Sequence, residues 1–91
     1  MEIRYSKSAM KFLEKLDKPT KQRIEIAILG LTEKPPKGDI KALVSYTDGI
    51  QRLRVGKYRI VFAYKMDGTI EVLLIMDIDS RGSIYKRRKR T

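Results

Sequence analysis

Arginines that alternate with apolar residues are the side chains of this sequence best suited to chemistry. Arg52 and Arg54 alternate with Leu53 and Val55. Successive side chains of a strand point to opposite faces, so the two arginines share one face. A guanidinium stays charged at any working pH and can bind two phosphate oxygens at once. The pattern therefore predicts an anion site on one face of a strand, and the expected anion is a phosphate.

The next residues, Gly56 and Lys57, predict a two-residue turn in which glycine supplies the positive φ of a type II′ hairpin. This register places Arg54 directly opposite Arg59. Like charges that face each other across a ladder destabilise it by up to about 1 kcal/mol, so a chain that keeps them is expected to offer both to an anion. The alternative is that Arg52, Arg54 and Arg59 are simply solvated on an open sheet face.

The composition of the 91 residues excludes several kinds of site. The chain has no cysteine and no histidine, which removes disulfides, thiol nucleophiles, Cys-based zinc sites and the usual general base. Asp77 and Asp79 are too sparse for a metal pair. We therefore expect neither a metal nor a cofactor.

The net charge of +10, from 21 basic against 11 acidic side chains, is typical of a protein that binds nucleic acid. A membrane surface is a weaker candidate partner. The apolar run Val72–Met76 is far too short to span a membrane, and the N-terminus lacks a signal-peptide core, so we expect a soluble cytoplasmic protein. The basic run Lys86–Arg90 is expected to be a solvated tail that adds affinity.

Positioning these arginines requires a sheet, and the hydrophobic pattern predicts a single domain over residues 1–91 with a basic tail at 86–91. A short strand at 2–5 precedes two helices, one capped by Ser6 and one that begins at Pro19 and ends before Pro35. Strand-like segments follow at 40–43, 51–55, 58–66 and from 69 onward. The expected fold is α+β, a two-helix hairpin packed on one face of a small twisted, mainly antiparallel four-stranded sheet in the order β-α-α-β-β-β.

The dipeptide Asp67-Gly68 is the strongest hairpin signal of the chain, and it predicts that Met66 pairs with Thr69 and hence Phe62 with Leu73. The two hairpins together divide the side chains between two faces. The face expected under the helices carries Leu53, Val55, Ile60, Phe62, Leu73 and Ile75. The open face carries the arginines and so much apolar surface that a partner chain is expected to cover part of it. Its apolar residues are Val61, Ile70, Val72, Leu74 and Met76.

The order of these elements and two short motifs resemble the RelE/ParE superfamily of type II toxin-antitoxin toxins. The motifs are Tyr58-Arg59-Ile60-Val61-Phe62 and Arg81-Gly82-Ser83-Ile84-Tyr85-Lys86, and the resemblance spans nearly the whole chain. It implies a metal-independent endoribonuclease of the RelE type that enters the ribosomal A site and cleaves mRNA, which inhibits translation. It also implies a cognate acidic antitoxin, similar to RelB, that holds the toxin inactive.

The resemblance assigns catalytic roles to three residues. Arg59 matches an arginine that stabilises the scissile phosphate, Arg81 matches the arginine before the C-terminal turn, and Tyr85 matches a tyrosine that stacks on a base or aids proton transfer. Tyr85 is equally well explained as a core or interface anchor, and Arg81 as an ion-pair partner of a nearby aspartate. The expected phosphate-binding residues are Arg52, Arg54, Lys57, Lys86, Arg87 and Arg88.

Two positions depart from the family pattern and leave the general base unidentified. Ile50 stands where active members often carry a lysine, and Ser80 stands where many carry a histidine. Arg52 cannot act as the base because its pKa lies above about 12. Proton transfer would fall to Tyr85, to a lysine whose pKa is lowered by neighbouring arginines, or to solvent.

Two other functions stay open on the sequence alone. One is a ParE-like toxin that inhibits DNA gyrase without catalysis, which the two departures favour and the three matched residues disfavour. The other is a basic RNA-binding module, which needs aromatic side chains beside the arginines for base stacking. Tyr58 and Tyr64 alternate onto the face expected under the helices, so no such platform is expected there.

Overall fold

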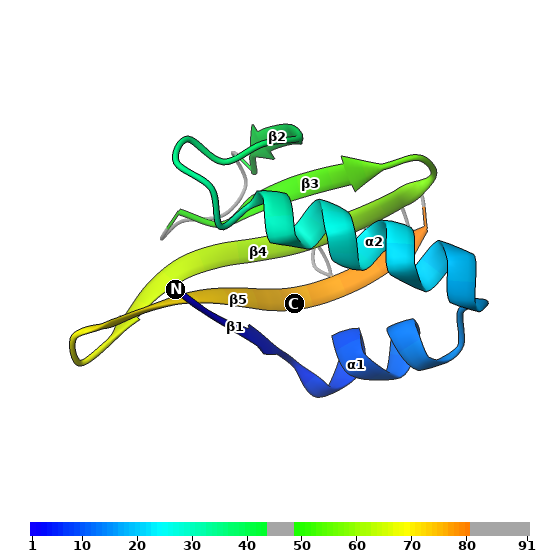
Figure 1. Ribbon diagram of the computed structural model, residues 1–91, viewed down its shortest axis with the longest axis horizontal. Coiled ribbons are helices and arrows are strands. Elements are labelled where there is room, and N and C mark those ends of the chain that lie inside the picture. The colour runs from blue at the N-terminus through cyan, green and yellow to red at the C-terminus, as the bar shows by residue number, and fades with distance from the viewer. Residues whose placement is uncertain (44–48, 81–91) are drawn as a thin grey trace.

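The structure is a computed structural model that describes residues 1–43 and 49–80 (Figure 1). One strand leads into two helices, and four more strands complete the fold. The elements are β1 (Glu2–Tyr5), α1 (Lys7–Glu14), α2 (Lys18–Gly30), β2 (Asp39–Ala42), β3 (Gln51–Val55), β4 (Tyr58–Asp67) and β5 (Ile70–Ser80).

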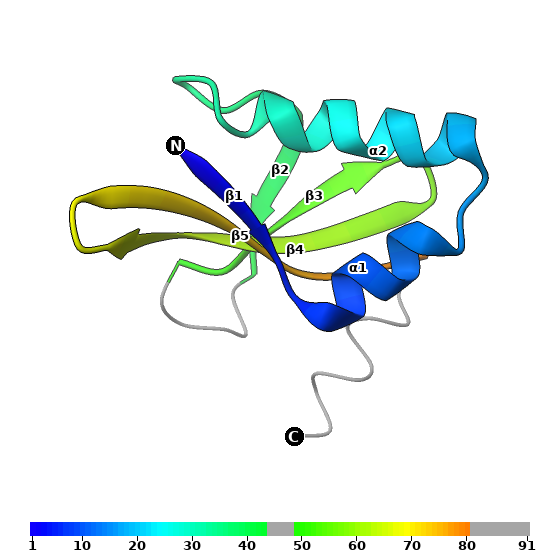
Figure 2. The same ribbon diagram turned by 60° about the horizontal axis from the view of Figure 1, so that its bottom comes forward.

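The strands form one sheet in the order β1-β5-β4-β3-β2, in which only β1 and β5 pair in parallel. The expected α+β class, with a helix pair on a mainly antiparallel sheet, is confirmed. The expected strand number of four is wrong, because the segment at 39–42 pairs with β3 as a full fifth strand. Figure 2 shows both helices on the same side of the sheet.

Polar caps begin both helices. Ser6 caps α1 as predicted, whereas α2 begins at Lys18, one residue before the predicted start at Pro19. The Ser6 hydroxyl accepts a hydrogen bond from the Ala9 N–H and donates one to the Met76 carbonyl, so it both caps α1 and ties the start of the helix to β5. The Asp17 carboxylate caps α2 by accepting from the Thr20 N–H. Each cap satisfies a backbone donor that the first turn of a helix leaves unpaired.

The core lies between the helices and one face of the sheet. Phe62 at its centre is fully buried and packs edge to face against Tyr64. The side chains expected under the helices are there, which confirms the predicted division of the faces. The buried cluster consists of Ala9, Leu13, Ile24, Ile28, Leu31, Leu53, Tyr58, Ile60, Phe62, Leu73, Ile75 and Ile78.

The two hairpins differ in how well their registers were predicted. Arg54 faces Arg59 across β3 and β4, as predicted. In the second hairpin Asp67 pairs with Ile70, so the turn residues are Gly68 and Thr69 and the predicted register is wrong by two residues. Gly68, with φ of 63°, is the first turn residue rather than the second.

Because of the same two-residue error, Phe62 pairs with Ile75 rather than with Leu73, and an irregularity between Val61 and Phe62 then shifts the β4–β5 register by one more residue. Because the turn error is an even number of residues, the side chains beyond it kept their predicted faces. The shift beside Val61 then brings Asp79 opposite Arg59.

The open face is less apolar at its surface than the sequence suggested. Val61 is fully buried and Val72 is only 3% exposed, so neither needs a partner chain to cover it. Ile70 is exposed at 48%, while Leu74 and Met76 are half-buried. The predicted apolar docking surface on this face is therefore wrong in two of its five members.

Candidate nucleic-acid interface

A row of four charged residues crosses the open face of the sheet. Asp39 on β2 pairs with Arg54 on β3, Arg54 pairs with Arg59 on β4, and Arg59 pairs with Asp79 on β5. Residues that face one another across strands point to the same side, so the four side chains form one line of two cations between two carboxylates. We call Asp39, Arg54, Arg59 and Asp79 the charged row.

Asp39 holds the arginines of β3 in place. Its carboxylate lies 2.8 Å from the Arg54 Nε and 3.3 Å from the Arg52 Nη1, and its backbone carbonyl accepts a further hydrogen bond of 3.0 Å from Arg52. The hydrogen bond from Arg52, and then the charges of both guanidiniums, lower the pKa of Asp39. The Asp39 carboxylate thus offsets part of the charge repulsion between Arg54 and Arg59. The presence of this arginine pair therefore does not by itself require an external anion.

The two arginines of β3 differ in exposure. The Arg52 side chain is only 15% exposed, whereas the Arg54 side chain is 52% exposed. A guanidinium held by two acceptors on one residue is fixed in orientation, which is the condition for preorganised electrostatic binding. Arg52 can therefore shape the potential of the face, while Arg54 is the better placed to meet a ligand.

Arg59 occupies the central strand and is half-buried. Within residues 1–43 and 49–80, no ion pair joins it to a carboxylate, although Asp79 lies opposite in the register. The Asp79 Oδ1 accepts a 2.8 Å hydrogen bond from the Ser80 N–H. Of the candidate arginines in the described chain, Arg59 lies on the central strand and is the one without an ion pair.

Lys57 does not join these arginines. Its ammonium lies 5.5 Å from the centre of the Tyr58 ring, which belongs to the core under the helices and packs edge to face against Phe12. Lys57 therefore leans toward the helix side of the β3–β4 turn. On α2, the Arg23 Nη2 lies so near Gly56 of this turn that a Cβ on Gly56 would come within 2.7 Å of it.

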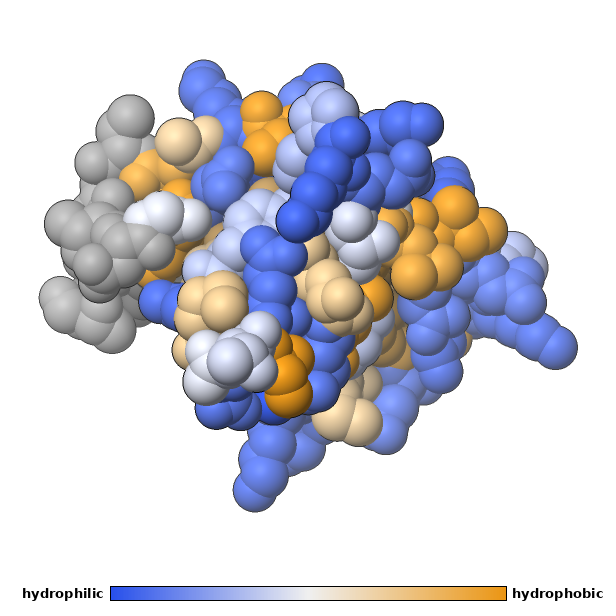
Figure 3. Space-filling model, turned by 60° about the vertical axis from the view of Figure 1, so that its left-hand side comes forward, coloured by the Kyte–Doolittle hydropathy of each residue, from blue (hydrophilic) through white to orange (hydrophobic). Residues whose placement is uncertain are grey.

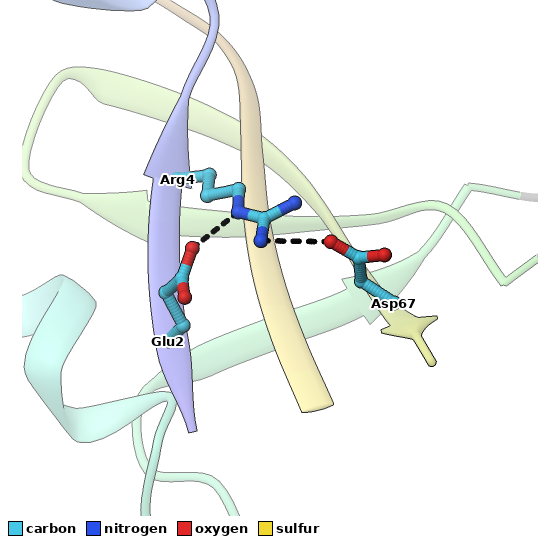
Figure 4. A network of polar contacts seen from close by, with 3 residues as sticks. All are labelled: Glu2, Arg4 and Asp67. Atoms are coloured by element: carbon cyan, nitrogen blue, oxygen red, sulfur yellow. Dashed lines mark hydrogen bonds and ion pairs between the residues drawn. The ribbon is translucent and has the colours of Figure 1, made fainter. Parts of the chain in front are cut away.

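At the far end of the open face another arginine is neutralised. Arg4 on β1 contacts Glu2 and forms a 2.9 Å ion pair with Asp67 (Figure 4). The hydrogen bonds to Glu2 and Asp67 raise the pKa of the Arg4 guanidinium. Among the described arginines of this face, Arg4, Arg52 and Arg54 are thus held in ion pairs, whereas Arg59 is not.

The remaining site predictions lie outside the described residues. These are Arg81, Tyr85, Lys86, Arg87 and Arg88. Ser80, which ends β5, is half-buried and pairs with Tyr58, and Ile50 is half-buried just before β3.

Sequence reasoning missed Asp39 as a site residue. A carboxylate at the start of a strand next to the arginine strand was a possible signal. It could be interpreted only once the register of β2 against β3 was known, because that register places Asp39 opposite Arg54. The described residues also contain no group of three acidic side chains that could hold a metal ion.

The aromatic rings of the described chain all lie on the helix side. Tyr64, for example, donates a 2.7 Å hydrogen bond to the Leu31 carbonyl, and burial raises its pKa. The rings in or against the core are Tyr5, Phe12, Tyr58, Phe62 and Tyr64. The described part of the open face therefore offers no stacking platform for bases, and its contribution to a binding site is limited to charge and hydrogen bonds. No described helix is long and apolar enough to cross a membrane.

A comparison with protein families matches residues 3–85 to the ParE toxin of the type II toxin-antitoxin system parDE. The structure is similar to the RelB-RelE antitoxin-toxin complex of Methanococcus jannaschii, with 25% identity over 92% of this chain and 96% of that chain and a TM-score of 0.67. The archaeal RelE-RelB complex of Pyrococcus horikoshii gives 26% identity over 89% and 94%, with a TM-score of 0.66.

A third solved structure, the YoeB/ParE toxin of Agrobacterium tumefaciens, shares the fold with a TM-score of 0.70 at 18% identity, over 89% of this chain and 99% of that one. A search of curated proteins found no match.

Proposed function

The chain belongs to the family of ParE toxins of type II toxin-antitoxin systems, and from this premise we propose that it is a ribosome-dependent endoribonuclease that cleaves mRNA in the A site. The observation that carries the proposal is the position of Arg59. It lies on the central strand of a rigid sheet, beside Arg54, with no ion pair to a carboxylate of residues 1–43 and 49–80. A cation in that setting is suited to the charge that develops on a phosphate.

The proposed reaction is attack by the 2′-hydroxyl of the RNA on the adjacent phosphate, which breaks the bond to the 5′-oxygen of the next nucleotide and leaves a 2′,3′-cyclic phosphate. A base removes the 2′ proton, and an acid or solvent protonates the leaving 5′-oxygen. Arg59 stabilises the added negative charge through two parallel hydrogen bonds, and Arg54 contributes from the neighbouring strand. Arg81 and Tyr85 follow the end of β5 in the chain, where Asp79 lies opposite Arg59, and this connection supports their assignment to the same site. No metal is required for this chemistry.

We further propose that an acidic antitoxin of the RelB type holds the chain inactive in the cytoplasm. The relatives with 25% and 26% identity were solved as complexes of RelE with RelB. A net charge of +10 favours an acidic partner, because complementary charge steers association and suppresses wrong pairs.

Inhibition of DNA gyrase is the second candidate function. The matched family is described by its ParE member, and in the described part of the open face no lysine or histidine lies beside Arg59 to transfer a proton. Ile50 and Ser80 occupy the positions where proton-transfer groups were expected. A toxin of this kind acts by binding a protein and needs no catalytic group.

Mapping of mRNA ends by primer extension after induction separates the two functions. The parent chain should produce new ends within translated codons, and Arg59→Ala should lower that cleavage by on the order of 10²-fold or more while the fold is kept. Lys65→Ala is the matched control, since Lys65 is exposed on the same face of β4 as Arg59. This variant should cleave mRNA like the parent.

Growth arrest that persists in Arg59→Ala without any new mRNA ends contradicts the nuclease proposal. If purified parent chain then inhibits gyrase supercoiling, the second function takes its place.

A further inference from the structure

The Asp39 carboxylate gives one oxygen to each arginine of β3. Its Oδ2 lies 2.8 Å from the Arg54 Nε, and its Oδ1 accepts a hydrogen bond of 3.3 Å from the Arg52 Nη1. The Asp39 backbone carbonyl accepts a second hydrogen bond, of 3.0 Å, from the same nitrogen of Arg52. The Arg52 side chain is mostly buried, so these two bonds fix the orientation of the carboxylate that holds Arg54.

The contact with Asp39 leaves Arg54 able to bind a phosphate. A guanidinium has five N–H donors in a rigid plane, and it binds a phosphate through two parallel ones. Asp39 meets only the Nε of Arg54, and within residues 1–43 and 49–80 the Nη1 and Nη2 form no hydrogen bond or ion pair. These two nitrogens are a parallel donor pair. Because the Arg54 side chain is 52% exposed, a ligand on the open face can reach them.

The donor pair of Arg54 lies beside the cation that we propose acts on the reacting phosphate. Arg54 stands directly opposite Arg59 in the β3–β4 register, and residues in such positions have Cβ atoms about 4.5–5.5 Å apart. Two guanidiniums at that spacing repel each other, so an arginine without a partner would turn toward solvent. Asp39 lies on the other side of Arg54, where β2 pairs with β3 (Figure 1), and its charge offsets this repulsion.

We propose that Asp39 is a positioning residue, which holds Arg54 so that its Nη1 and Nη2 bind the same RNA phosphate as Arg59. The inference rests on the proposed nuclease function and adds the residue that prepares its phosphate site. A side chain that is held in place before the ligand arrives loses less conformational freedom on binding. It also presents its charge in a fixed direction, which is the condition for electrostatic stabilisation of a transition state.

The charge of Asp39 alone predicts the opposite effect on RNA binding. Asp39→Asn removes one of the 11 acidic side chains and raises the net charge from +10 to +11, which should strengthen the binding of any RNA. Loss of positioning should weaken binding, so the sign of the change separates the two effects. Asp67→Asn is the matched control, because it removes the same charge and also breaks an ion pair with an arginine, Arg4 on β1 (Figure 4).

The test uses the full chain and a short single-stranded RNA with 2′-O-methyl groups, which can bind but cannot be cleaved. In fluorescence anisotropy at one fixed salt concentration, Asp39→Asn should bind this RNA more weakly than the parent by about threefold or more. Asp67→Asn should bind it at least as tightly as the parent. Cleavage of mRNA, mapped by primer extension, should fall by about tenfold or more in Asp39→Asn and stay at the parent level in Asp67→Asn. Circular dichroism checks that both variants fold.

A double variant separates positioning from a merely structural role. In the Arg54→Ala background, Asp39→Asn should cause no further loss of RNA binding or of cleavage, because Asp39 acts through Arg54. A structural role would lower both by the same factor whether or not Arg54 is present.

Three results overturn the proposal. The first is an Asp39→Asn variant that binds the methylated RNA as tightly as the parent or more tightly, which means that the carboxylate competes with RNA for Arg54. The second is a loss that is equally large with and without Arg54, and the third is a parent chain that does not bind the methylated RNA. A parent chain that binds it with the expected dependence on Asp39 but produces no new mRNA ends contradicts the nuclease proposal alone.

Discussion

At the scale of single residues, Asp39 has the largest influence on how the basic face is presented. It binds Arg52 and Arg54 at once, so two of the three arginines predicted from the sequence are partly neutralised. The arginines could be read from their alternation, but their partner could not, because it comes from a strand whose register the sequence left open. Interactions across strands depend on pairing, which local pattern does not determine.

The lowered pKa of Asp39 gives a prediction about acid stability. A carboxyl whose pKa is lower in the folded chain stabilises the fold above its unfolded pKa of about 3.9, and that contribution is lost as the pH falls through the folded pKa. Urea unfolding of the parent at a series of acidic pH values should therefore lose stability more steeply than Asp39→Asn does.

Glu14→Gln serves as the control for that measurement, because Glu14 is exposed and forms no ion pair with another described residue. It should follow the parent curve. Identical slopes for the parent and Asp39→Asn would mean that the contacts of Asp39 with the arginines do not persist in solution.

At the scale of elements, the two hairpins show what local sequence can and cannot predict. The β3–β4 turn was predicted correctly because its glycine comes first and fixes the turn type. In the β4–β5 hairpin the glycine again comes first, but Asp67 remains in the strand. The irregularity between Val61 and Phe62 has no signal in the residue types, since both positions are apolar and buried.

The two turn glycines provide a matched pair of substitutions. Gly56 and Gly68 have φ of 59° and 63°, so alanine at either position should cost roughly 1–2 kcal/mol of unfolding free energy through backbone strain. Only at Gly56 would the new Cβ also meet Arg23, and the flexible end of that side chain can move aside. Urea unfolding should give similar losses for Gly56→Ala and Gly68→Ala.

A Gly56→Ala loss much larger than that of Gly68→Ala would show that Arg23 is fixed against the turn. The double variant Gly56→Ala with Arg23→Ala would then recover the difference.

Phe62 tests the packing of the sheet against the helices. Its side chain is fully buried, so Phe62→Ala should lower the unfolding free energy by roughly 3–5 kcal/mol. Ile70→Ala is the comparison, because Ile70 is 48% exposed near the hairpin tip and should change stability far less. Chemical denaturation followed by circular dichroism measures both. Equal losses would place Phe62 outside the cooperative core.

At the scale of the whole molecule, the net charge is the property that could be predicted most directly from the sequence. Figure 3 shows the side that carries the β4–β5 hairpin tip, where apolar side chains form separate patches among hydrophilic ones. A shallow apolar hollow of about 190 Å³ lies on this side, lined partly by Met1, Leu31 and Tyr64. Composition predicted a basic protein, but the distribution of apolar surface required the folded chain.

Removal of residues 86–91 takes away five of the positive charges and should weaken binding to single-stranded RNA. The slope of log affinity against log salt should become shallower by about 0.7 for each phosphate that the tail no longer neutralises. Fluorescence anisotropy with a labelled oligonucleotide measures the slope, and removal of Thr91 alone is the control. An unchanged slope would mean that the tail does not bind the RNA backbone.

The family and the order of elements could be predicted because the Tyr58–Phe62 motif and the periodicities are local properties. The pairing of the 39–42 segment as a fifth strand and the row from Asp39 to Asp79 could not be, because both depend on the register between strands. Two of the five residues predicted for the docking surface on the open face were wrong for the same reason. Burial of Val61 and Val72 is decided by the assembled sheet and not by their spacing.

The position of β5 in the sheet has a consequence for the timing of folding. It lies between β1 and β4, and its parallel partner β1 is the first strand of the chain. Neither side of β5 can pair until residues 70–80 have been synthesised, and the Ser6 hydroxyl cannot reach Met76 before then. Pairings between segments so distant in sequence form late and slowly. The domain therefore completes its fold only after residues 70–80 have been synthesised.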